Sequence, residues 1–183
     1  MHYLAFLRGI NLGRRRLKME KLRALFEALK FRQVTTFIAS GNVAFESAAR
    51  DESKLTAQIE RHLQKELGYE VDTFLRTREE LARIVDDQPF AKEIDGQDSS
   101  TVHVGFFREA LPSAIARKLE AVRTETDAFR VRGREYYWLC HTRISESEVW
   151  TLPAMREFRL PASSMRNLKT LRKMAALYPP KST

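Results

Sequence analysis

Three short stretches combine arginine, glycine and asparagine in patterns that suit the binding of an anion. They run from Arg8 to Gly13, from Ser40 to Val43 and from Ser164 to Asn167. Glycines can expose main-chain N–H groups, and an arginine can pair with phosphate or carboxylate through two hydrogen bonds. The sequence therefore predicts these ligand-binding residues: Arg8, Gly9, Asn11, Gly13, Ser40, Gly41, Asn42, Arg166 and Asn167.

The most specific prediction is one anion site, in a basic cleft between the halves of the chain, that unites Arg8, Asn11 and Arg166. We expect Arg166 and Asn167 in the first turn of the last helix, where free N–H groups and the helix dipole favour an anion. The competing interpretation is structural. In it the glycines serve turns, the asparagines satisfy loop backbone groups, and Arg166 pairs with an acidic side chain.

The same stretches resemble a known family. Members of the bacterial domain-of-unknown-function family numbered 1697 open with RGIN-x-G, continue with SGNV-x-F and close with a helix that carries RN-x-x-T-x-x-K. This chain has RGINLG at 8–13, SGNVAF at 40–45, and RN at 166–167 followed by Thr170 and Lys173. The resemblance spans nearly the whole chain and implies a duplicated ferredoxin-like fold. It implies no activity, because the family has none that is settled.

Familiar catalytic signatures are missing from the sequence. It contains no nucleophile elbow, no phosphate loop with a Walker lysine, no dinucleotide-binding glycine pattern and no cysteine–histidine spacing suited to zinc. We therefore predict no metal and no cofactor, the catalytic residues stay unknown, and whether the chain is an enzyme stays open. A general base could come from Asp72, Asp127 or Glu135 only if the fold places one beside the site. His103 lies in a predicted strand, where a satisfied imidazole is the simpler interpretation.

Charge is unevenly distributed along the chain. Residues 8–32 hold nine basic and two acidic side chains, residues 153–183 hold seven and one, and the part between them has a net charge of −5. If the fold brings the basic segments together, they form one positive surface for phosphate-bearing partners. The alternative is that these residues are the solvated faces of amphipathic helices.

Composition predicts a soluble cytoplasmic protein with no membrane segment. No window approaches the roughly 18 apolar residues of a membrane helix, and the apolar stretch at the N-terminus is too short for a signal peptide. Cys140 is the single cysteine, which fits a reducing compartment.

The first half of the chain has the order β-α-β-β-α-β of a ferredoxin-like fold. Apolar periodicity and turn residues predict strands at 2–7, 34–39, 43–46 and 70–76, and helices at 18–29 and from Asp51 or Ser53 to Leu67. The residues Ser40, Gly41 and Asn42 favour a tight hairpin. We expect the loop after Leu7 and this hairpin to lie near opposite ends of the sheet.

The second half repeats the order less regularly. A helix from Thr77 to Val85 and a linker to residue 100 precede a strand at 101–107, a helix at 112–122 and a hairpin of 128–131 with 136–140. After Ser145 the sequence favours helix with an interruption at Pro153, and a last helix capped by Ser163 or Ser164 ends before Pro179. The fold class is therefore α+β, with domains at 1–76 and 101–183 joined by 77–100.

Three functions compete. The first is binding of a small phosphorylated or nucleotide-like ligand. The second is binding of RNA, which ferredoxin-like sheets also perform, although the expected stacking aromatics are few. The third is a structural protein that forms homo-oligomers through an open sheet edge. The sequence does not decide the oligomeric state.

Overall fold

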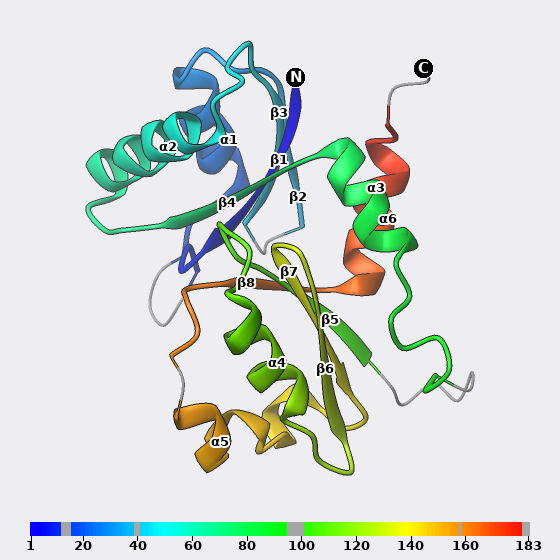
Figure 1. The fold of residues 1–183 in the computed structure, drawn as a ribbon. Coiled ribbons are helices and arrows are strands. Elements are labelled where there is room, and N and C mark those ends of the chain that lie inside the picture. The colour runs from blue at the N-terminus through cyan, green and yellow to red at the C-terminus, as the bar shows by residue number, and fades with distance from the viewer. Residues whose placement is uncertain (12–15, 39–40, 95–100, 158, 181–183) are drawn as a thin grey trace. The chain divides into compact units, whose positions relative to one another are not determined.

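The computed structural model describes residues 1–11, 16–38, 41–94, 101–157 and 159–180. The chain forms two compact units (Figure 1), one of residues 1–83 with 174–183 and the other of residues 84–173. Each unit is built on a four-stranded antiparallel sheet with helices. The predicted α+β class, two ferredoxin-like halves and a C-terminal helix, is confirmed. The domain boundaries at 76 and 101 stay a prediction.

The first unit has the predicted order of elements. They are β1 (His2–Arg8), α1 (Met19–Ala28), β2 (Arg32–Phe37), β3 (Asn42–Glu46), α2 (Glu52–Leu67) and β4 (Asp72–Thr77). The strands lie in the order β2-β3-β1-β4, and each neighbouring pair is antiparallel. This places β1 and β3 at the centre of the sheet, as the ferredoxin-like pattern requires. After β4 comes α3 (Arg78–Asp86).

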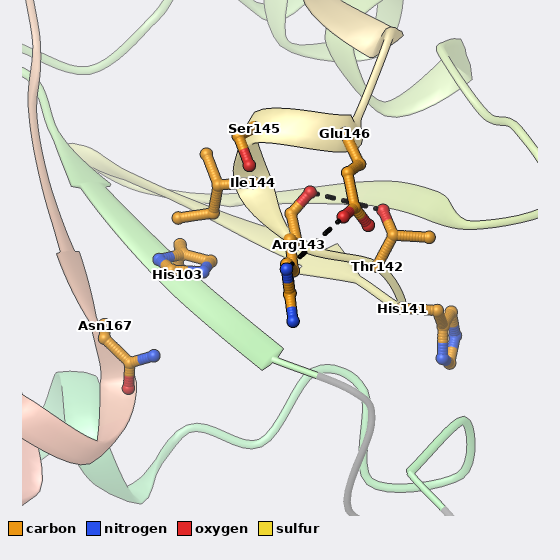
Figure 2. Close-up of a pocket in the computed structure, with 8 residues that line it drawn as sticks. All are labelled: His103, His141, Thr142, Arg143, Ile144, Ser145, Glu146 and Asn167. Carbon is orange, nitrogen blue, oxygen red and sulfur yellow. Dashed lines mark hydrogen bonds and ion pairs between the residues drawn. The ribbon is translucent and has the colours of Figure 1, made fainter.

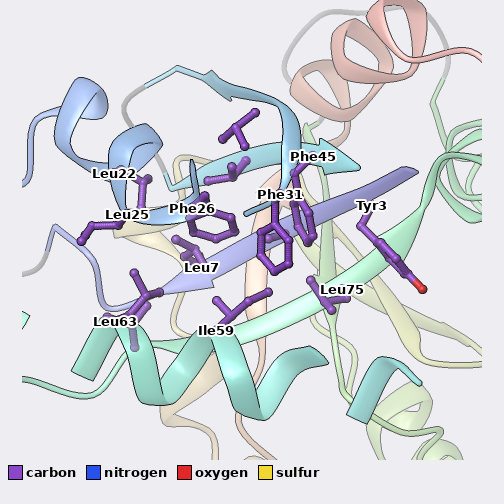
Figure 3. Close-up of a cluster of buried hydrophobic side chains, with 14 of the residues drawn as sticks. Tyr3, Leu7, Leu22, Leu25, Phe26, Phe31, Phe45, Ile59, Leu63 and Leu75 are labelled. Atoms are coloured by element: carbon purple, nitrogen blue, oxygen red, sulfur yellow. The ribbon is translucent and has the colours of Figure 1, made fainter. Parts of the chain in front are cut away.

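The core of the first unit follows from alternation along its strands. Successive strand residues point to opposite faces, so Tyr3, Ala5 and Leu7 of β1 lie on the face that α1 and α2 cover. Figure 3 shows Tyr3 and Leu7 with Phe26 of α1 and Ile59 of α2, and all of these residues belong, with Ala5, to one buried cluster.

Local signals set the helix ends. The side chain of Asp51 accepts the Lys54 N–H at 3.0 Å and caps α2, and Gly68 ends α2 in the left-handed conformation. Thr77 and Glu80 exchange side-chain-to-main-chain hydrogen bonds at the start of α3, a capping box. None of the helices in the described residues is long and apolar enough to cross a membrane.

The second unit repeats the plan with one helix replaced. Its elements are β5 (Thr101–Phe106), α4 (Ser113–Ala121), β6 (Asp127–Arg132), β7 (Glu135–Cys140) and β8 (Ser164–Asn167), in the sheet order β6-β7-β5-β8. Between β7 and β8 lie the short turns η1 (Ile144–Glu146) and η2 (Val149–Thr151) and the short helix α5 (Pro153–Arg156). Pro153 therefore begins a helix, where its missing N–H costs nothing.

The last helix begins later than the sequence indicated. We expected Ser163 or Ser164 to cap it, but residues 164–167 form β8, and α6 (Leu168–Leu177) starts after them. The reason is the open edge of β5, whose main-chain groups pair with β8 in antiparallel register from His103–Asn167 to Phe106–Ser164. The main-chain groups of residues 164–167 therefore form hydrogen bonds with the edge of a sheet, and not within a helix as we expected.

Candidate functional site

The first two glycine-containing stretches meet at one end of the first unit's sheet. The Leu7 N–H donates to the Gly41 carbonyl at 2.8 Å, and Phe6 is opposite Asn42 in the β1–β3 register. The expectation that they lie at opposite ends is wrong. Because β1 and β3 are antiparallel, the end of β1 lies beside the start of β3.

Polar side chains at this corner are engaged by the protein itself. Arg8 Nη1 donates to Asp72 Oδ2 at 2.8 Å, and Asn11 Oδ1 accepts the Leu17 N–H at 2.8 Å. Gly9 and Gly41 have φ of +83° and +74°, a region that glycine enters without strain.

The remaining predicted residues of this corner divide into two groups. Asn42 is fully buried, and its Nδ2 donates to the Phe37 carbonyl at 3.1 Å. Gly13 and Ser40 lie outside the described residues. These contacts give the described residues of the corner structural roles.

The third stretch lies in the second unit, on β8. Arg166 and Asn167 are neighbours along a strand, so their side chains point to opposite faces of the sheet. Arg166 donates to Ser164 Oγ and to the Met165 carbonyl, both at 2.8 Å, and burial lowers its pKa to about 10. Their placement in the first turn of a helix was wrong. A site that joins Arg8, Asn11 and Arg166 stays a prediction.

A wide, open cavity of about 920 Å³ lies in the second unit (Figure 2). It is lined by His103 of β5, by Asn167 of β8 and by residues 141–146, which follow β7. Of the predicted binding residues that the structure describes, Asn167 alone lines it.

His103 is the most unusual residue of the cavity. It is 5% exposed, its ring centroid lies 5.5 Å from that of Trp138, and burial lowers its pKa below the ordinary value of 6.5. The imidazole is therefore neutral at pH 7. Its Nε2 is buried and has no hydrogen-bond partner within the described part of the chain. Buried polar atoms are nearly always paired, so this one marks a missing partner.

Asn167 presents a donor beside His103. Its Oδ1 accepts the Lys169 N–H at 2.8 Å and so caps α6. The Nδ2 group finds no acceptor among the residues that the structure describes. The first turn of α6 contains no acidic side chain, which leaves the positive end of the helix dipole without a carboxylate.

The charged side chains of the cavity, Arg143 and Glu146, lie on its exposed side. Arg143 Nη1 lies 3.9 Å from Glu146 Oε1, and the two side chains are 85% and 56% exposed. Ion pairs of this kind contribute little because water screens them. Figure 2 shows both on the far side of the cavity from Asn167.

The carboxylates proposed as a general base have other roles. Asp72 binds Arg8, and Asp127 accepts hydrogen bonds from Thr124, Thr126, Trp138 and Ser147. Glu135 begins β7, and none of these three described carboxylates lines the cavity.

The cysteine and metal chemistry of the described residues is equally limited. Cys140 is buried, and burial raises the pKa of its thiol, which makes it a poor nucleophile. Within the described ranges, no group of three histidine, cysteine, aspartate or glutamate side chains could hold a metal ion.

From the sequence, His103 was expected to be a satisfied imidazole, and neither His141 nor Arg143 was expected to belong to a site. The interpretation of His103 is corrected by the unpartnered Nε2. The sequence did contain a signal for a buried imidazole, because His103 stands between Val102 and Val104 in a predicted strand. Recognising it required the pairing of His103 with Asn167, which depends on the unpredicted strand β8.

Two ferredoxin-like units, one with an open cavity of small-molecule size, define an α+β protein with a candidate ligand site. A family model described as "Protein of unknown function (DUF1697)" matches residues 1–137, and the chain belongs to this family. No curated protein matches the chain.

One solved structure with a similar fold is that of the conserved bacterial protein SP0830 from Streptococcus pneumoniae. The two proteins are 20% identical, the match covers 98% of each chain, and the TM-score is 0.74. At this identity the similarity supports the fold alone.

Proposed function

We propose that this protein binds a small phosphorylated or nucleotide-like ligand in the cavity of its second unit. The observation that carries the proposal is the buried imidazole of His103, a residue that lines the cavity and whose Nε2 is buried with no hydrogen-bond partner among the described residues. A ligand that supplies the missing partner gains a hydrogen bond from which bulk water is excluded.

Three further features support an anionic group on the ligand. Asn167 offers an amide donor, α6 begins one residue later, and Arg143 adds a positive charge at the exposed side. Helix starts favour anions, and guanidinium groups pair well with phosphate. The volume of about 920 Å³ also falls in the range of small-molecule sites.

RNA binding has less support. Recognition by a ferredoxin-like sheet uses exposed aromatic side chains on which bases stack. The aromatic residues Phe6 and Phe74 of the first sheet and Tyr137 of the second are buried. The RNA alternative therefore depends on the basic segments alone, and it stays a prediction, as does the homo-oligomer.

Thermal unfolding with a panel of phosphorylated metabolites and nucleotides tests the proposal. At a hundredfold excess over Kd, a ligand should raise the Tm of the wild type by about 5–10 °C. His103→Gln should abolish the rise. His62→Gln is the matched control, because His62 also has a buried, unpartnered Nε2 among the described residues but lies on α2, outside the cavity.

The proposal fails if no compound of the panel shifts the wild type. It also fails if the same compound shifts His103→Gln as much as it shifts the wild type and His62→Gln.

A further inference from the structure

Resting on that proposed function, we infer that the phosphoryl group of the ligand binds between His103 and Asn167, where uncharged donors hold it, and not at the exposed guanidinium of Arg143.

Asn167 can offer only its donor to the cavity. The Lys169 N–H occupies Oδ1 at 2.8 Å and so fixes the orientation of the amide. The Nδ2 group, which has two N–H bonds, is then the part left for a ligand. Its complement is an acceptor oxygen, which phosphoryl and carboxylate groups supply and an amine does not.

His103 can provide a second donor at the same place. Asn167 and His103 are opposite each other in the β8–β5 register, so their side chains lie on one face of the sheet. A neutral imidazole carries one N–H, and the tautomer with its proton on Nε2 donates to the same oxyanion. Figure 2 shows Ile144, which is 43% exposed, beside His103.

The surroundings favour an oxyanion that is bound by N–H groups and the helix dipole, and not by a positively charged side chain. The first turn of α6 begins at Leu168, directly after Asn167, and adds the positive end of a ten-residue helix. Arg143, by contrast, is 85% exposed and faces Glu146. Its attraction for an anion is screened by water and salt.

Calorimetric titration of the full chain with inorganic phosphate and with a nucleoside monophosphate tests the inference. Asn167→Asp is the decisive variant, because aspartate caps a helix as well as asparagine but replaces the donor by a negative charge. We expect it to weaken binding of both probes at least tenfold. Arg143→Gln should weaken binding less than threefold. Circular dichroism and Tm establish that both variants are folded.

Each outcome separates the inference from the proposed function. If Asn167→Asp binds both probes like the wild type, or Arg143→Gln alone loses them, the phosphoryl position is wrong while ligand binding stands. If acetate binds the wild type and neither phosphate nor the nucleotide does, the site takes carboxylates and the phosphoryl assignment is wrong. If no probe binds the wild type, the inference fails, and the proposed function falls with it only if no compound of the panel raises the Tm of the wild type either.

Discussion

The indole Nε1–H of Trp138 donates a 2.7 Å hydrogen bond to Oδ1 of Asp127, and both side chains are buried. The same oxygen accepts the Ser147 hydroxyl at 2.9 Å. Asp127 therefore ties β7 to the segment that follows η1. Since residues 141–146 line the cavity, this carboxylate supports the shape of the candidate site without contacting a ligand.

Replacing Asp127 by asparagine should destabilise the protein by about 1–3 kcal/mol. The amide NH2 of asparagine would take the place of one carboxylate oxygen and would face hydrogen-bond donors of the neighbouring side chains. Burial alone would raise the pKa of Asp127, but hydrogen bonds from Thr126, Ser147, Trp138 and Thr124 outweigh it and lower the pKa below 3.8. A lowered pKa means that the folded state binds fewer protons than the unfolded state. Asp127 therefore stabilises the fold fully above pH 3.8 and loses this effect as pH falls through the folded value.

Urea unfolding of Asp127→Asn across acidic pH measures both effects. The variant should be less stable than the wild type at pH 7 and converge with it at low pH. Asp51→Asn is the control, because asparagine caps α2 equally well and should cost little at pH 7. A constant difference from pH 7 to pH 2 would contradict the role of the Asp127 charge.

Gly41→Ala should cost more stability than Gly68→Ala, although both glycines have positive φ, +74° and +77°. A Cβ at Gly41 would lie 2.8 Å from Ile10 Cγ2 and 3.2 Å from Leu7 Cβ, whereas nothing lies within 4 Å at Gly68. Gly68→Ala should cost about 1 kcal/mol for backbone strain, and Gly41→Ala about 1–3 kcal/mol more for the clash. Equal losses in chemical denaturation would show that the corner of β1 and β3 relaxes freely.

Gly41 also illustrates how far the sequence could predict this structure. Its neighbours Ser40 and Asn42 indicated the hairpin, and strong periodicity indicated α1 and α2, because these are local patterns. The contact of Gly41 with Leu7 and Ile10 depends on the direction of the strands. The ferredoxin-like order makes β1 and β3 antiparallel, but we expected the end of β1 and the start of β3 at opposite ends of the sheet.

The candidate site was harder to predict because it depends on a non-local pairing. Four residues from Ser164 to Asn167 form a strand only because β5 has an open edge. Without β8, Asn167 appeared to lie in a helix and His103 had no visible partner. The three resembling stretches therefore indicated the family and the fold, and of their described residues Asn167 lies in the lining of this cavity.

Gly105→Ala should destabilise the second unit by about 2–4 kcal/mol, since overpacking a filled core displaces rigid groups. A Cβ at Gly105 would lie 1.9 Å from Cε1 of the Tyr136 ring, which is 3% exposed and packs 5.3 Å from Phe107 between ring centroids. Gly105 is needed because the Tyr136 ring crosses over β5. Near-ultraviolet dichroism and Tm check this change. Gly105→Ala with Tyr136→Leu should recover part of the loss, and no recovery would place the strain elsewhere.

His103 should make folding stability depend on pH between neutrality and pH 5. Burial lowers its folded pKa below the ordinary value of 6.5, so the unfolded chain takes up a proton first as pH falls. The stabilising effect is complete above pH 6.5 and declines below it, by at most about 1.4 kcal/mol per pH unit.

His2, whose pKa burial and Arg78 also lower, should add a separate slope of the same sign. Urea unfolding at pH 7.5 and 5.5 should therefore give a smaller loss of stability for His103→Gln than for wild type, and the smallest loss for the double variant with His2→Gln. Because the His103 ring lies 5.5 Å from Trp138, the fluorescence of folded protein should also fall when His103 is protonated. If His103→Gln shows the same pH slope as wild type, His103 is charged or solvated in the folded state, and the neutral donor on which the proposed site depends is lost.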